Sequence, residues 1–202
     1  MRVASRAALL ALLPCAAGAQ VTVSVPWDGA HTFTCTAGSE FFCGQSFTTP
    51  TTYTTLQSFS LHMQTASSLS FELYALSGSD VVGPALYTQT FGPTAGIATV
   101  TFAPPAGLAL TAGASYAALV RVAAGTQIVF LDNWAAPYAG GGLATGCQPT
   151  CDFVVPDVDI DLAFTASFVP EPATLGLVAL GMLALGGAAR SRSRRRGAVL
   201  FE

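Results

Sequence analysis

The chain has 202 residues, of which 51% are hydrophobic and 9% are charged, and its formal net charge at pH 7 is −3. Between residues 20 and 169, nine acidic residues face a single arginine, Arg121, and no lysine. This balance argues against nucleic acid as a partner, because contacts to a phosphate backbone need clustered lysine and arginine. The same region is long enough for one domain with a core of its own.

Residues 1–19 have the three parts of a secretory signal peptide. Two arginines precede an apolar stretch at residues 7–13, and Ala17-Gly18-Ala19 supplies the small residues that signal peptidase reads. We expect cleavage before Gln20, since the apolar stretch is too short to span a membrane. The alternative is a lipobox ending at Cys15, which the proline before that cysteine fits poorly.

Residues 20–169 contain short runs of β-branched and aromatic residues, with turn residues between them and little helical periodicity. The predicted strands are Val21–Val25, Tyr53–Met63, Ser68–Ala75, Leu86–Phe91, Thr99–Phe102, Ser115–Val122, Gln127–Leu131 and Asp159–Phe168. A parallel fold would need crossover helices, and the pattern contains none. The sequence therefore predicts an all-β ectodomain, an antiparallel two-sheet sandwich of jelly-roll-like type.

Four cysteines remain after removal of the signal peptide, and export places them in an oxidising compartment. We favour disulfides that each close a short loop, Cys35–Cys43 and Cys147–Cys151, among the three possible connectivities. A zinc site is the alternative. Its cysteine spacing is loose, and His31 and His62 are the only histidines.

Trp134 and Tyr138 border a glycine-rich stretch, residues 139–142, that we predict to be a loop. Exposed aromatic rings can stack on the apolar faces of sugars. Trp134 and Tyr138 are therefore candidate glycan contacts, with Asp132 or Asn133 as a hydrogen-bonding partner. The alternative is a tryptophan that covers the edge of the sandwich. Trp27, which lies near Asp28 and His31, has the same two interpretations with less support.

Asp157, Asp159 and Asp161 alternate with apolar residues, so on one strand their carboxylates would share a face. A Ca²⁺ ion with oxygen ligands could relieve their repulsion. The alternative is a solvated outer face, which the same alternation explains equally well. The sequence indicates no other cofactor.

No arrangement of residues predicts catalysis. There is no G-x-S-x-G motif, and the acidic residues form no pair that stands out for glycoside hydrolysis. We therefore expect a protein without enzymatic activity and keep an extracellular hydrolase as the least favoured hypothesis. Arg121 lies in an apolar strand, where we expect an outward charge or a partner for one aspartate.

Short motifs along residues 45–168 resemble a family of bacterial jelly-roll ectodomains that often precede C-terminal sorting tails. They are Gln45–Phe47, Leu110–Tyr116, Trp134 with Tyr138–Gly141, and Asp161–Phe164. The resemblance implies an architecture similar to that of carbohydrate-binding modules, and it implies no activity.

The C-terminal segment has three parts: Pro170-Glu171-Pro172, an apolar run at residues 173–189, and a basic cluster. The cluster consists of Arg190, Arg192, Arg194, Arg195 and Arg196. The apolar run predicts one membrane-spanning helix of about 25 Å. Arginines stop transfer and stay in the cytoplasm, so the ectodomain should lie outside and residues 197–202 inside. A buried C-terminal helix is the alternative.

This three-part order resembles the PEP-CTERM sorting signal of Gram-negative bacteria. The resemblance implies processing near Pro-Glu-Pro by exosortase, a membrane-embedded cysteine peptidase. It also implies a host that makes exopolysaccharide. We therefore expect an exported cell-surface or matrix protein, held at the inner membrane and then sorted to the surface or secreted, that acts in adhesion or in association with exopolysaccharide. The second hypothesis is a calcium-dependent carbohydrate-binding module.

Overall fold

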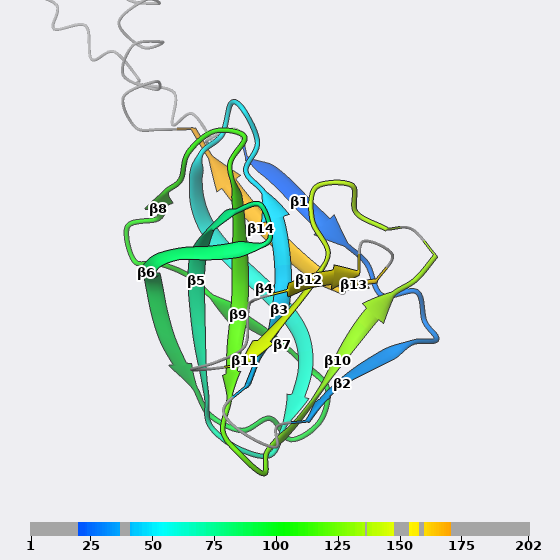
Figure 1. Ribbon diagram of the computed structural model, residues 1–202. Helices are drawn as coiled ribbons and strands as arrows, with labels where there is room; N and C mark the ends of the chain where they lie inside the picture. The colour runs from blue at the N-terminus through cyan, green and yellow to red at the C-terminus, as the bar shows by residue number, and fades with distance from the viewer. Residues whose placement is uncertain (1–19, 37–40, 136, 148–153, 158–159, 171–202) are drawn as a thin grey trace, which may run out of the picture.

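The computed structural model describes residues 20–36, 41–135, 137–147, 154–157 and 160–170. These residues form two antiparallel sheets that pack face to face (Figure 1). The predicted all-β, two-sheet architecture is therefore confirmed. No described segment is a helix long and apolar enough to cross a membrane. The predicted signal peptide, Glu171, Pro172, the apolar run and the arginine cluster lie outside the described residues.

The first sheet has the order β1-β14-β4-β10-β13, and three further strands pair with its members. Strand β2 pairs with β10, while β7 and β8 pair with β4. The bounds are β1 (Val21–Val25), β2 (Thr32–Thr36), β4 (Thr55–Thr65), β7 (Ala98–Phe102), β8 (Leu108–Ala109), β10 (Gln127–Asn133), β13 (Asp161–Leu162) and β14 (Phe164–Val169).

The second sheet has the order β12-β11-β3-β9-β5-β6. Its strands are β3 (Phe41–Thr48), β5 (Leu69–Ser77), β6 (Asp80–Phe91), β9 (Ser115–Val122), β11 (Leu143–Cys147) and β12 (Val154–Asp157). Consecutive strands repeatedly change sheet, so most pairings join residues that are far apart in the sequence.

The alternation of apolar and polar residues did not predict β3, because both faces of this strand are buried. Every residue from Phe42 to Phe47 is buried, Gln45 and Ser46 included. A strand that is covered on both faces has no reason to alternate. Gly44 also weakens the pattern, yet the pairing with β9 requires it, since a Cβ there would lie 1.9 Å from the carbonyl oxygen of Ala118.

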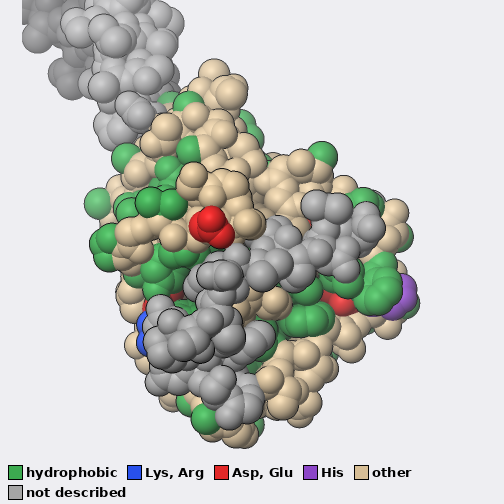
Figure 2. Space-filling view, in the orientation of Figure 1, with side chains coloured by type: hydrophobic (Ala, Val, Ile, Leu, Met, Phe, Trp, Pro, Cys, Tyr) green, Lys and Arg blue, Asp and Glu red, His purple; other side chains and the backbone are tan. Residues whose placement is uncertain are grey.

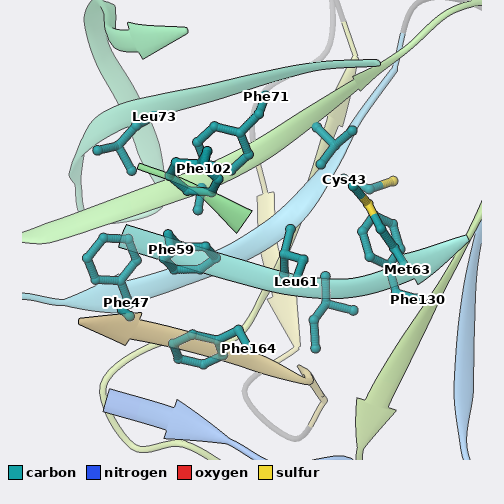
Figure 3. Packing of buried hydrophobic residues seen from close by; sticks show 14 of the residues in the cluster. Cys43, Phe47, Phe59, Leu61, Met63, Phe71, Leu73, Phe102, Phe130 and Phe164 are labelled. Carbon is teal, nitrogen blue, oxygen red and sulfur yellow. The ribbon is translucent and has the colours of Figure 1, made fainter. Parts of the chain in front are cut away.

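Phenylalanine rings from both sheets fill the core around Phe59 (Figure 3). Phe59 stacks with Phe102 and with Phe164, both at 5.3 Å between ring centroids. From the opposite sheet, Phe47 approaches it to 5.3 Å and Phe71 to 6.2 Å. This central position follows from the pairing of β4 with β7 on one edge and β14 on the other.

The outer face of the second sheet is also partly buried, and it holds the partner of Arg121. The guanidinium donates to both carboxylate oxygens of Glu72, at 2.8 and 3.1 Å, and lies over the ring of Phe42. Tyr74 donates its hydroxyl to the same carboxylate, and burial raises the pKa of Tyr74 to about 12. Arg121 thus pairs with a glutamate on the neighbouring strand β5, where we expected an outward charge or a partner for one aspartate.

Cys35 and Cys43 form the predicted disulfide, which joins β2 of the first sheet to β3 of the second. The two cysteines are 8 residues apart in the sequence. Closing a loop of this length stabilises a fold by about 2.5 kcal/mol, because it lowers the entropy of the unfolded chain. The bridge also fixes the β1–β2 region against the core. Cys151 and the side chain of Cys147 lie outside what the structure describes, so their pairing stays a prediction.

Both ends of the described domain lie at the same end of the sandwich. Val21 pairs with Phe168, and Val25 at the other end of β1 pairs with Phe164. A strand of five residues is about 15 Å long. Residues that follow Val25 therefore lie about one strand length away from the point where β14 ends.

Candidate functional site: an exposed aromatic platform

The pairing of β2 with β10 brings together two segments that are about a hundred residues apart. Thr32 pairs with Leu131 in this antiparallel register. The loop before β2, with Trp27 and His31, therefore lies beside the end of β10, where Trp134 follows. In Figure 1 this loop extends from one side of the molecule, and Figure 2 shows histidine and hydrophobic side chains together at that edge.

Three aromatic side chains, Trp27, His31 and Trp134, form what we call the aromatic platform. The ring of His31 stacks on Trp134, with 5.2 Å between centroids and 18° between planes. The indole N–H of Trp27 donates to the carbonyl oxygen of His31 at 2.9 Å. Trp134 is 54% exposed and Trp27 is 47% exposed. The platform therefore offers ring surface to solvent while hydrogen bonds and stacking hold its members in place.

Asp28 organises the loop that carries the platform. Its Oδ1 accepts the backbone N–H groups of Ala30 and His31, at 2.8 and 3.0 Å. Its Oδ2 accepts the backbone N–H of Trp134 at 3.3 Å and pairs with Nδ1 of His31 at 2.5 Å. The His31 side chain is the main cause that holds the pKa of Asp28 well below its usual range.

Asp132 and Asn133 support the platform from the last residues of β10. The indole N–H of Trp134 donates to Oδ2 of Asp132 at 2.9 Å. Asn133 donates its side-chain amide to the carbonyl oxygen of Pro26 at 2.8 Å and thereby ties β10 to the residue before Trp27. The sequence suggested Asp132 or Asn133 as a hydrogen-bonding partner for a sugar, but the described hydrogen bonds of both side chains are to other protein groups.

The described contacts of the Tyr138 side chain are with the core and with β3, whereas the sequence suggested that it would share a surface with Trp134. Its ring is half-buried and packs edge-on against the ring of Phe164, with 5.6 Å between the centroids. Its hydroxyl lies 3.4 Å from the backbone N–H and carbonyl oxygen of Thr48. Burial raises the pKa of Tyr138. These contacts hold the β10–β11 loop against Phe164 and against Thr48 of β3.

A buried pair, Gln45 and Asp161, joins the two sheets beside Tyr138. Gln45 donates its side-chain amide to Oδ1 of Asp161 at 2.6 Å and accepts the backbone N–H of Leu162 at 2.8 Å. The other oxygen, Oδ2, accepts the backbone N–H of Tyr138 at 2.5 Å. Both side chains are fully buried, and burial raises the pKa of Asp161. The short motifs around these residues therefore meet at one structural junction.

Strand geometry separates two of the three aspartates that we expected on one face. Asp157 ends β12 in the second sheet, whereas Asp161 begins β13 in the first. Asp159 lies outside the described residues, as does the side chain of Asp157. Over the parts of the chain that the structure describes, no group of three or more His, Cys, Asp or Glu residues is suited to a metal ion. The predicted calcium site stays a prediction.

A groove of about 390 Å³ lies next to the β10–β11 loop and offers a less favourable binding surface. The hydroxyl groups of Ser46 and Thr48 line it, but they already donate to the carbonyl oxygens of Gly142 and Gly140. Its described lining contains no aromatic ring and no charged side chain. Gly141 serves packing here, because a Cβ would lie 2.0 Å from the carbonyl oxygen of Ser46.

Comparison with known proteins identifies the C-terminal segment. Residues 168–195 match the family model described as the PEP-CTERM protein-sorting motif. The chain carries a PEP-CTERM sorting motif. No curated protein and no solved structure shows significant similarity to the chain.

The PEP-CTERM motif joins the folded domain without a linker. Its match begins at Phe168, inside β14, which ends at Val169. The match includes Pro170-Glu171-Pro172 and the predicted arginine cluster as far as Arg195. A PEP-CTERM motif marks an exported surface protein that exosortase processes.

Proposed function

We propose that this protein associates with exopolysaccharide at the cell surface or in the extracellular matrix and has no enzymatic activity. A single helix over residues 173–189 would hold it in the inner membrane, with the ectodomain outside the cytoplasm, until exosortase releases or transfers it. The PEP-CTERM motif supports the export and the processing. The aromatic platform supports the association with sugar.

The observation that carries this proposal is the exposure of Trp134 in an ordered setting. More than half of the residue is open to solvent, although its indole N–H and backbone N–H are both bonded. An exposed indole that is already held in place loses little entropy when a sugar stacks on it. The position of the platform, about one strand length from the end of β14, leaves it accessible while the C-terminal segment is in the membrane.

Replacing Trp134 with alanine should weaken the binding of exopolysaccharide from the native host by about tenfold, which corresponds to about 1.4 kcal/mol. Trp27→Ala should have a smaller effect in the same direction, because its indole N–H holds the backbone of His31, whose ring stacks on Trp134. Co-sedimentation of the full-length protein with purified exopolysaccharide measures both.

Ile97→Ala is the control for the loss of an exposed apolar side chain, since Ile97 is 49% exposed and precedes β7. It should bind as the unchanged protein does. If Trp134→Ala also binds unchanged, the platform is not the site of association.

Processing predicts two forms of the protein in the native host. Peptide mapping by mass spectrometry should find secreted or surface protein that ends near Pro170-Glu171, and unprocessed protein in the membrane fraction only. If every copy extends to Glu202 and stays in the membrane, the helix is a permanent anchor and the proposed release is wrong.

A further inference from the structure

Negative charge is concentrated around the aromatic platform. Asp28 contacts both His31 and the backbone of Trp134 through one carboxylate. Because its pKa lies below the usual range of aspartate, this carboxylate stays ionised at neutral and mildly acidic pH. A ligand that stacks on Trp134 therefore lies beside an ionised carboxylate, which is itself paired with His31.

Asp132 places a second carboxylate against the indole of Trp134. One oxygen, Oδ2, accepts the indole N–H, while Oδ1 is buried and has no hydrogen-bond partner among the residues that the structure describes. Asp132 is only 1% exposed, and burial raises its pKa. A cation beside the exposed indole of Trp134 would favour the charged form of this carboxylate, because a nearby positive charge lowers the pKa of an acid.

The one permanently positive side chain between residues 20 and 169 is paired on the second sheet. Arg121 is the one lysine or arginine between residues 20 and 169, and it forms a two-bond ion pair with Glu72 on the second sheet. No described lysine or arginine is therefore left at the platform to receive a uronate or sulfate group. A sugar polymer with acidic groups would meet repulsion from Asp28 and from the acidic ectodomain.

We propose that the aromatic platform selects polymers of amino sugars that carry free amino groups. An ammonium group is attracted to the face of an indole and to neighbouring carboxylates, while the apolar face of the sugar ring stacks on Trp134. This inference rests on the proposed function, and it names the class of polysaccharide that the platform binds.

Three oligosaccharides of equal length test the inference with the full-length protein in detergent. They are a glucosamine oligomer, its fully N-acetylated counterpart and a galacturonic acid oligomer. At about pH 6 sugar amines are charged and ordinary aspartates are ionised. Calorimetry at low salt should give a Kd for the glucosamine oligomer that is about fivefold lower than for the acetylated one. The galacturonic acid oligomer should bind weakest.

Asp132→Asn removes the charge but keeps an oxygen that can accept the indole N–H of Trp134. This variant should lose most of the preference for the free amine, whereas Asp80→Asn, at an exposed aspartate of β6, should keep it. If Asp132→Asn does not fold, the salt dependence of the unchanged protein decides. High salt should reduce the preference, because it screens the attraction between the solvent-facing ammonium group of the ligand and the carboxylates.

The outcomes separate this inference from the proposed function. Equal or tighter binding of the acetylated or acidic oligomer would overturn the amino-sugar preference and leave association with polysaccharide intact. A preference that resists both high salt and Asp132→Asn would also overturn it, since charge would not be the cause. Failure of all three oligomers and of the host exopolysaccharide to bind would overturn both.

Discussion

Replacing Phe59 with alanine should lower the free energy of unfolding of the ectodomain, residues 20–169, by about 3–5 kcal/mol. Phe59 is fully buried and contacts rings from both sheets, among them Phe47 and Phe164. Closely packed rings on four sides cannot collapse into the space that the side chain leaves, so the cavity adds to the lost hydrophobic transfer energy. Urea unfolding followed by tryptophan fluorescence measures the change.

Phe33→Ala is the matched control for this prediction. Phe33 is only partly buried at the edge of the core, and its ring centroid lies 6.5 Å from that of Phe130. Its truncation should cost about 1 kcal/mol. Similar losses for the two variants would mean that the rings around Phe59 are not the centre of the core.

Replacing Asp161 with alanine should lower the free energy of unfolding by about 2–4 kcal/mol. The change removes the acceptor for two buried donors, the side-chain amide of Gln45 and the backbone N–H of Tyr138. Each donor left without a partner carries a desolvation cost. Because this junction joins β3, β13 and the β10–β11 loop, hydrogen exchange of the Tyr138 amide should also accelerate in the variant.

The same carboxyl group predicts how stability depends on pH. Burial raises the pKa of folded Asp161 above the unfolded value of about 3.9. The folded state therefore binds the proton more tightly, so the contribution of Asp161 to stability rises as pH falls from neutral through the folded pKa. Asp132, whose pKa is also raised, acts in the same direction. At pH below about 4, stability should fall again as Asp28, whose folded pKa is lowered, loses its contribution.

Asp161→Asn separates this charge effect from the loss of hydrogen bonds. The variant keeps one acceptor and the size of the side chain, so its unfolding free energy should vary less between neutral pH and about pH 4 than that of the unchanged protein. A pH profile identical to that of the unchanged protein would show that Asp161 does not titrate differently in the two states.

Much of the fold class could be predicted because alternation is a local signal. Leu69, Phe71 and Leu73 all face the core, as their spacing in β5 predicts. The pattern missed β3, where burial covers both faces, and the short strands β2, β8 and β11. It also predicted one strand over Asp159–Phe168, where the structure has β13 and β14. Glu72 and Tyr74 lie on the face of β5 that alternation assigns to solvent, yet both are buried, and Glu72 pairs with Arg121.

The candidate site could be predicted only in part. Trp134 stood out as an aromatic residue beside a glycine-rich loop, and Trp27 with His31 was a separate, weaker candidate. No local pattern shows that they form one surface, because the contact depends on the register between β2 and β10. The pairing of Trp134 with Tyr138 followed sequence proximity, whereas the ring of Tyr138 turns inward against Phe164.

The sequence by itself determined the PEP-CTERM motif, the acidic character of the ectodomain and its all-β class, and it predicts a signal peptide. These features depend on composition or on residues close together in the chain. The charge, the length of an apolar run and the period of apolar residues can be read there without knowing the fold. Tertiary structure alone decided that His31 stacks on Trp134, that Arg121 pairs with Glu72 and that Gln45 donates a hydrogen bond to Asp161. Each of these contacts depends on long-range antiparallel pairing, and many registers satisfy the same local pattern until the sheets pack on each other.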